Sequence, residues 1–211
     1  MKNTRENILN TSKILFNELG YSQVTIRMIA LQLKMSSGNL NYHFKKRENI
    51  LEALYFEMVE VFDQRINELD EQSSSLKVIK QEIQKSMTRM VEFKFFWTDL
   101  FNLLKQNNNI RKHFEEAYQN RIKGHHFLLK MLRAKNLLQE PTFIKEHQFL
   151  IERMTDYGNT WLYASSLYEQ NEITTIYIEN QANILLSMYY PYLTDLGKEE
   201  FKELIPGYFG G

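Results

Sequence analysis

The stretch Thr25–Lys46 reads TIRMIALQLKMSSGNLNYHFKK and decides the fold of the N-terminal part of the chain. The hydroxyl of Thr25 can cap a helix over residues 26–34, because it can accept a hydrogen bond from a free backbone N–H group. Ser36 can cap a second helix over residues 37–44 in the same way. Two short helices joined by so tight a turn predict a helix-turn-helix, whose second helix enters the major groove of DNA.

The apolar residues of this stretch recur at helical spacing. We expect Leu33, Leu40 and Phe44 to pack against the preceding helix, and the small Ala30 to let the two helices cross closely. That preceding helix is predicted from an apolar face and from Gly20, which stands where a glycine ends a helix. The residues of this face are Ile8, Leu9, Leu15, Phe16 and Leu19. They would form the core of a three-helix unit whether or not it binds DNA.

Polar residues at and around the second helix are the candidates for DNA contact. They are Ser36, Ser37, Gly38, Asn39, Asn41, Tyr42, His43, Lys45 and Lys46. Free N–H groups at the start of the helix favour a phosphate. Asn pairs with adenine, an aromatic ring packs on sugar or a thymine methyl, and the cations reach flanking phosphates. A purely structural unit would not explain exposed Asn, Tyr and His residues beside a basic cluster.

This segment resembles the DNA-binding domain of TetR-family repressors. The resemblance rests on Arg5–Leu9, Phe16–Tyr21, Thr25–Ala30, Ser37–Lys45 and Lys46–Leu51. It implies that Thr25 and Arg27 join the DNA-binding residues. The sequence departs from the family at Asn41, where many members have Tyr, and at Ser37, where Pro is frequent.

Composition agrees with a helical protein. The 211 residues include three prolines, eight glycines and no cysteine, so helix breakers are few and disulfides and thiolate sites are excluded. The net charge is zero, but residues 1–50 carry eight Lys and Arg against three Glu, which gives +5 there and −5 in the remainder. A basic face at one end suits a polyanion.

Helical periodicity continues through the rest of the chain. It predicts helices over residues 46–69, 76–92, 98–106, 110–135, 143–168 and 173–190. We expect Thr142 to cap the helix over 143–168, and the last helix to end near Pro191. The predicted fold is therefore all-α, with a helix-turn-helix DNA-binding domain over residues 1–47 and a larger helical domain over residues 48–211.

The family resemblance implies that the larger domain dimerises and binds a small-molecule effector. Dimerisation would use the helices over 143–168 and 173–190, in which Gly158 and Ser165 would permit close approach of a second copy. The alternative is a purely intramolecular apolar stripe. Aromatic and Met residues that could line a site for a small apolar or aromatic effector are Trp97, Phe101, Phe114, Tyr118, Phe127, Met154, Tyr157 and Trp161. The same residues could instead fill a core.

We expect no cofactor, no metal site and no catalytic residue. His125 and His126 are adjacent, so they leave a helix in different directions and cannot chelate together. The sequence has no glycine-rich phosphate loop, GxSxG motif or paired-carboxylate signature. No segment has the ~18 to 20 apolar residues of a membrane helix, and the N-terminus lacks the apolar run of a signal peptide. We therefore expect a cytoplasmic protein with no membrane association.

The sequence predicts a DNA-binding transcriptional regulator, by family resemblance a repressor, whose operator affinity falls when an effector binds. Three alternatives stay open. The first is an all-helical ligand-binding or structural module without DNA binding, which would lack the steep salt dependence of a DNA binder. The second is an all-α enzyme, and the third is a regulator that responds to a protein partner or to no ligand.

Overall fold

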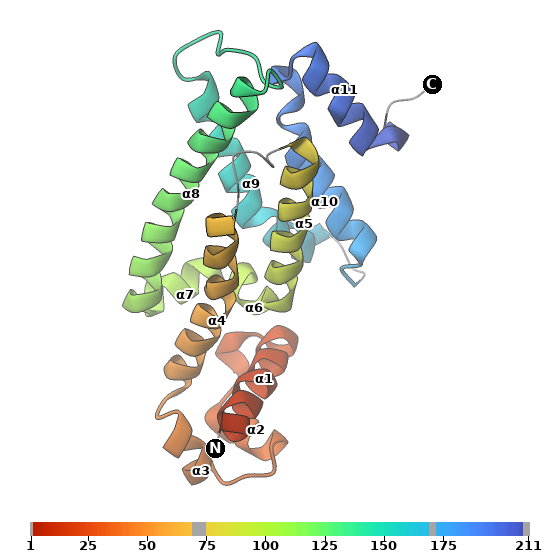
Figure 1. The fold of residues 1–211 in the computed structure, drawn as a ribbon. Coiled ribbons are helices and arrows are strands. Elements are labelled where there is room, and N and C mark those ends of the chain that lie inside the picture. Colours follow the sequence, from red (N-terminus) through yellow and green to blue (C-terminus); the bar gives the residue numbers. More distant parts are fainter. Residues whose placement is uncertain (1, 69–74, 169–171, 209–211) are drawn as a thin grey trace. The chain divides into compact units, whose positions relative to one another are not determined.

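A computed structural model describes residues 2–68, 75–168 and 172–208. Figure 1 shows the helices of these ranges. The described residues contain no β-strand, only an isolated β-bridge between Leu138 and Leu193. The α-helices are α1 Lys2–Leu19, α2 Ile26–Gln32, α3 Ser37–His43, α4 Arg47–Glu68, α5 Leu76–Glu92, α6 Lys94–Thr98, α7 Leu100–Gln106, α8 Asn108–Ala134, α9 Glu146–Tyr168, α10 Thr175–Ser187 and α11 Asp195–Leu204. Short 3-10 helices cover Tyr21–Gln23, Tyr190–Tyr192 and Pro206–Tyr208. The predicted all-α fold is confirmed.

The chain forms two compact units. The first contains residues 1–64 and 92–114, and the second contains residues 65–91 and 115–211. Besides residues 1–47, the first unit includes most of α4, together with α6, α7 and the start of α8.

The first unit is built on α1, α2 and α3: α2 contacts both α1 and α3, and α1 also contacts α6. Its core consists of fully or almost fully buried apolar side chains from each helix. They include Ile8, Phe16, Val24, Ile29, Ala30, Leu40, Phe44, Ile50 and Leu54. The helical spacing was right for Ile8, Leu9, Phe16, Ala30, Leu40 and Phe44. It was wrong for Leu19, which is 47% exposed, while Leu15 and Leu33 are only half-buried.

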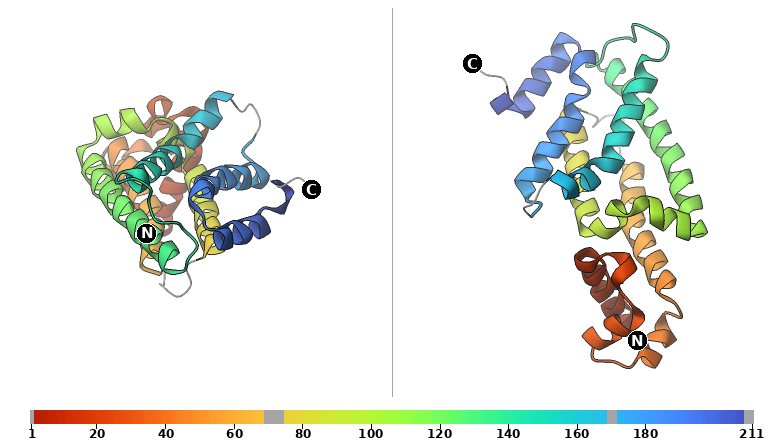
Figure 2. Two further views of the ribbon diagram at one scale, coloured as in Figure 1. Left: turned by 90° about the horizontal axis from the view of Figure 1, so that it is seen from above. Right: turned by 180° about the vertical axis from the view of Figure 1, so that it is seen from behind.

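The second unit contains α9 and α10 in direct contact, with α5 and the C-terminal part of α8 beside them (Figure 2). The buried indole N–H of Trp161 in α9 donates to the sulfur of Met90 in α5, at 3.3 Å. A close approach also fixes α11: a Cβ on Gly197 would lie 2.2 Å from the carbonyl oxygen of Leu137. Only glycine therefore fits where α11 meets the turn after α8.

Two helices were not predicted, and one predicted cap is wrong. Helix α6 is short, and three successive aromatic residues in it are buried, so it shows no amphipathic pattern. Helix α11 follows Pro191 and is capped by Thr194, whose hydroxyl accepts from the N–H of Gly197. Thr142 caps nothing, because α9 begins at Glu146 and the Glu146 carboxylate accepts from both the N–H and the hydroxyl of Thr142.

Candidate nucleic-acid interface

Both predicted helix caps of the Thr25–Lys46 stretch are present. The Thr25 hydroxyl accepts from the N–H of Met28 at 3.2 Å, and α2 begins at the next residue. The Ser36 hydroxyl accepts from the N–H of Asn39 at 3.1 Å, and α3 begins at Ser37. Each cap satisfies one of the free donors at a helix start, which sets the tight turn between the helices.

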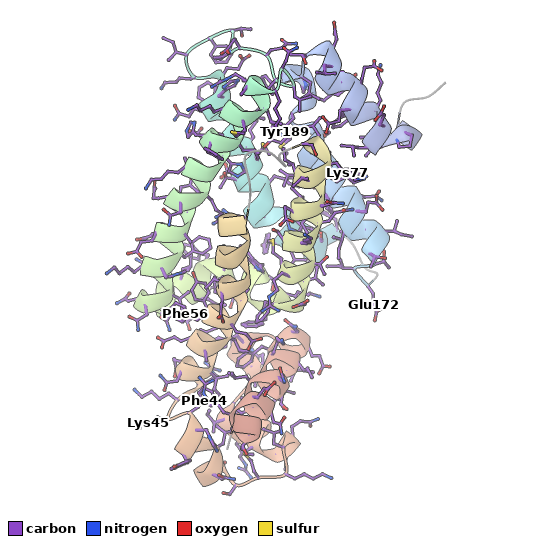
Figure 3. All side chains as sticks on the ribbon, viewed as in Figure 1. Phe44, Lys45, Phe56, Lys77, Glu172 and Tyr189 are labelled. Carbon is purple, nitrogen blue, oxygen red and sulfur yellow. The ribbon has the colours of Figure 1, made fainter. Side chains whose placement is uncertain are left out.

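Helix α3 has one buried face and one exposed face. Leu40 is fully buried, and the C-cap Phe44 is buried as well. The Arg5 guanidinium of α1 covers the Phe44 ring, with its carbon 4.9 Å from the ring centre. Figure 3 labels Phe44 and its neighbour Lys45, which is exposed. The apolar face thus fixes how α3 presents its opposite face.

The exposed face carries most of the polar residues expected to meet DNA. Tyr42 is 72% exposed, and its ring makes an edge contact with the ring of His43 at 5.3 Å between centres. His43 is half-buried. The other predicted DNA-binding residues are all exposed: Thr25, Arg27, Ser36, Ser37, Gly38, Asn39, Asn41 and Lys46. The structure therefore places the set on the surface around α2 and α3.

Arg47 follows two exposed lysines but turns inward. Its Nη1 donates to the carbonyl oxygens of Val24, Tyr21 and Ser22 at 2.7, 3.1 and 3.3 Å. The guanidinium carbon also lies 4.1 Å from the centre of the Tyr21 ring. Arg47 thereby holds the segment between α1 and α2 against the start of α4.

In the sequence, Arg47 is only one of the eight basic residues among residues 1–50. Burial raises the pKa of the nearby Tyr21 hydroxyl, while the charge of Arg47 and its hydrogen bond act in the opposite direction. The half-buried position of Arg47 follows from contacts with residues more than twenty positions away, so local charge patterning could not reveal it.

Asn17 joins α1 to the start of α6 within the same unit. Its side-chain amide donates to the Glu92 carbonyl oxygen at 2.9 Å and accepts from the Phe95 N–H at 3.0 Å. The ammonium of Lys13, one turn earlier, lies 4.7 Å from the centre of the Phe93 ring. The helix that packs under the helix-turn-helix is thus tied to residues 92–95, which explains why those residues belong to the first unit.

Two family models match the chain. One, described as bacterial regulatory proteins of the tetR family, covers residues 8–54, and the other, described as a bacterial transcriptional repressor and named TetR, covers residues 57–201. Together they span most of the sequence. The chain belongs to the TetR family. This is a family of DNA-binding transcriptional regulators and not of enzymes.

Similar proteins agree with the TetR assignment. The transposon Tn10 TetC protein of Escherichia coli is 32% identical over 62 residues, which are 29% of this chain and 32% of that protein. The match thus spans about a third of the relative's length. A TetR-family regulator from Marinobacter aquaeolei superposes with a TM-score of 0.87 at 21% identity, covering 98% of this chain and 99% of the other.

Two further structures share the fold. A TetR regulator from Haloarcula marismortui has a TM-score of 0.69 at 12% identity, covering 92% of this chain and 100% of that one. A transcriptional regulator from Saccharomonospora viridis in complex with choline has a TM-score of 0.66 at 18% identity, with the same coverage. At such identities the likeness shows the TetR fold.

The aromatic and Met residues expected to bind an effector divide between the two units of this TetR protein. In the first unit Trp97 is buried, Phe114 is half-buried, and Phe101 is 76% exposed. The remaining five belong to the second unit, where Met154 and Trp161 are buried, Tyr118 and Tyr157 are half-buried, and Phe127 is 46% exposed. Phe101 and Phe127 therefore lie on the surface, and the other six are wholly or partly enclosed.

Polar contacts accompany these side chains. The Tyr157 hydroxyl in α9 donates to the Gln181 side chain in α10, and burial with the nearby Tyr177 raises the Tyr157 pKa to about 12.

In the first unit, the indole N–H of Trp97 is buried and has no acceptor among the described residues. A buried donor without a partner is costly, so this N–H is a candidate contact for a bound molecule.

Among the described residues, no group of three or more His, Asp or Glu side chains could hold a metal ion. No helix in that part of the chain is long and apolar enough to cross a membrane.

Proposed function

We propose that this TetR-family protein is a repressor that reads its operator with the exposed face of α3. The observation that carries the proposal is the division of α3 into a buried face, with Leu40 and Phe44 beside it, and an exposed face with Asn39, Asn41 and Tyr42. Asn side chains can pair with adenine, and the Tyr42 ring can pack on a thymine methyl or sugar. Arg27 in α2 and Lys46 after α3 are exposed and can contact phosphates.

We further propose that the protein acts as a homodimer through α9 and α10, because two half-sites need two recognition helices. Several large apolar side chains on these helices are exposed although the helices also contribute to the core. They are Phe149, Tyr163, Leu167, Tyr168, Ile176 and Ile184. A Cβ on Gly158 would meet nothing within 4 Å, so a second copy could approach closely there. Such exposed apolar surface favours a protein partner.

The third part of the proposal is a small-molecule effector that lowers operator affinity. It is supported by the enclosed aromatic residues, by the unsatisfied N–H of Trp97, and by the choline held by the Saccharomonospora viridis regulator of the same fold. The effector would favour a conformer with a different separation of the two α3 helices. Operator affinity would then fall by the ratio of the effector's affinities for the two conformers.

The decisive test of DNA reading uses the Tyr42→Ala, Lys46→Ala double variant in gel-shift titrations. The probe is a duplex that the wild-type protein selects from a random double-stranded pool. We expect the double variant to bind at least tenfold more weakly, because it loses about 1–3 kcal/mol of base or sugar contact and a phosphate contact. A Lys105→Ala, Lys112→Ala variant removes two exposed cations of the same unit and serves as control. Equal affinity of the Tyr42/Lys46 variant and wild type would refute the site.

The effector test combines unfolding midpoints with DNA release. A compound that binds the folded protein raises the midpoint as its concentration rises, and choline is the first compound to try. An effector must also lower the affinity of the protein for the selected duplex. A broad set of compounds that shift the midpoint without changing DNA affinity would contradict regulation by such ligands.

A further inference from the structure

Lys34, between α2 and α3, has an unusual backbone conformation. Its φ angle is +53°, in the left-handed region that residues with a Cβ rarely adopt. The N–H of Lys34 donates to the Leu31 carbonyl at 3.0 Å, and the N–H of Met35 donates to the Ala30 carbonyl at 3.0 Å. These two bonds form a Schellman motif, a helix ending in which glycine normally occupies the place of Lys34.

The end of α8 contains the same motif with a different residue. There the N–H of Asn136 donates to the Arg133 carbonyl at 2.8 Å, and the N–H of Leu137 donates to the Leu132 carbonyl at 2.9 Å. Asn136 has a φ angle of +57°. Asn enters this conformation more readily than other residues with a Cβ. Lys has no such preference for the left-handed conformation. Lys34 therefore lowers the stability of the folded protein relative to Gly or Asn at the same position.

A strained residue that stability does not explain is a reason to look for a function. The Lys34 side chain is exposed, and among the described residues no carboxylate pairs with it. It stands two residues before the cap of α3, while the exposed Lys45 and Lys46 stand just after the end of that helix. Cations therefore precede and follow the proposed reading helix.

The length of α3 is close to the distance between the two phosphate backbones that border the major groove. Seven helical residues span about 10 Å, and the major groove of B-DNA is about 12 Å wide. Cations before and after α3 can thus meet the backbones on both sides of a groove that receives α3. We propose that Lys34 is a DNA-backbone contact, held in a strained turn so that its ammonium meets a phosphate beside the recognition helix. The inference rests on the proposed role of α3 and adds a residue outside the predicted DNA-binding set.

The test exchanges the residues of the two matched turns. Lys34→Asn removes the charge and keeps a residue suited to the left-handed conformation, and Lys34→Arg keeps the charge. Asn136→Lys places a lysine in the equivalent turn of the second unit as the control. Affinity is measured for the selected duplex and for a duplex of mixed sequence over a range of salt concentrations, and unfolding midpoints are measured without DNA.

We expect Lys34→Asn to raise the unfolding midpoint by about 2–4 °C and Asn136→Lys to lower it by a similar amount. Lys34→Asn should flatten the salt dependence of both duplexes by about 0.9 for each protein copy bound. Such a slope amounts to about an eightfold loss of affinity per copy at 0.1 M salt relative to 1 M. Lys34→Arg and Asn136→Lys should bind DNA as wild type does.

Three results would overturn the inference. One is unchanged affinity of Lys34→Asn while the Tyr42/Lys46 variant loses binding, which would leave the proposed reading helix intact and make Lys34 a turn residue only. The second is a loss of affinity with an unchanged salt slope, which would mean that Lys34 acts through the shape of the turn. In the third, neither variant changes affinity, and the proposed reading helix fails together with the inference.

Discussion

The Nη1 atom of Arg47 lies 2.7 Å from the carbonyl oxygen of Val24, twenty-three residues earlier in the chain. Val24 directly precedes the cap of α2, and Arg47 is the first residue of α4. One side chain thus joins the entrance of the helix-turn-helix to the helix that leaves it. The contact is a charged group donating to neutral acceptors, a kind of hydrogen bond stronger than the average.

We predict that Arg47→Met lowers the free energy of unfolding by about 2 kcal/mol, because several partly buried carbonyl groups lose a charged donor. The salt slope of DNA binding should stay at the wild-type value, since Arg47 is committed to carbonyls. The exposed Lys46 provides the contrast: Lys46→Ala should lower the slope by about 0.9 per copy with little change in stability. Urea unfolding and salt-dependent titrations measure the two quantities. A lower slope for Arg47→Met would show that the guanidinium contacts phosphate.

The proposed homodimer predicts a change of mass on substitution of an exposed apolar residue. Ile176 in α10 is 71% exposed, and Ile176→Glu would place a charge in the interface, which opposes association. Sedimentation analysis should show wild type as a dimer and the variant as a monomer or a weak dimer. Ile144, fully exposed in the segment between α8 and α9, is the matched control. Dissociation by Ile144→Glu alone would move the interface away from α10.

We predict that the free energy of unfolding falls at acid pH because of His125. Burial lowers its pKa to about 4, and the neighbouring charges of Arg121 and His126 add to the effect. Between this value and the unfolded pKa of about 6.5, only the unfolded state binds the proton, so stability falls as the pH drops through this window. The loss between about pH 7 and about pH 5 should be about 2 kcal/mol.

Denaturant unfolding of His125→Gln should show a smaller change over the same pH range, because the neutral side chain cannot bind the proton. His126→Gln, at the exposed neighbouring position, should retain most of the wild-type dependence, because burial is the largest cause of the lowered His125 pKa. If wild type and His125→Gln lost equal stability on acidification, His125 would not be the group responsible.

Local signals in the sequence were sufficient for the helix-turn-helix. Thr25 and Ser36 act within three residues of their own positions, and the spacing of Leu40 and Phe44 requires only helical geometry. The short helices α6 and α11 were missed for the opposite reason. Burial of Phe95, Phe96 and Trp97 on all sides removes the alternation on which the prediction depends, and α11 owes its position to the close approach of Gly197 to Leu137.

Helical spacing also fails to predict which of the candidate effector residues are buried. Trp97 and Phe101 stand four residues apart in sequence, yet one is buried and the other is 76% exposed. The two residues lie in separate short helices, α6 and α7, so helical spacing across them has no meaning. Their surroundings depend on which distant helices pack against each.

The sequence by itself determined the helical class, the two caps, the buried face of α3 and the membership of residues 5–55 in a recognisable DNA-binding segment, because caps and helical periodicity act over a few residues. Tertiary structure decided that Arg47 faces the carbonyl of Val24 although its basic neighbours face solvent. This outcome depends on hydrogen bonds that exist only once the segment between α1 and α2 has come to lie against the start of α4.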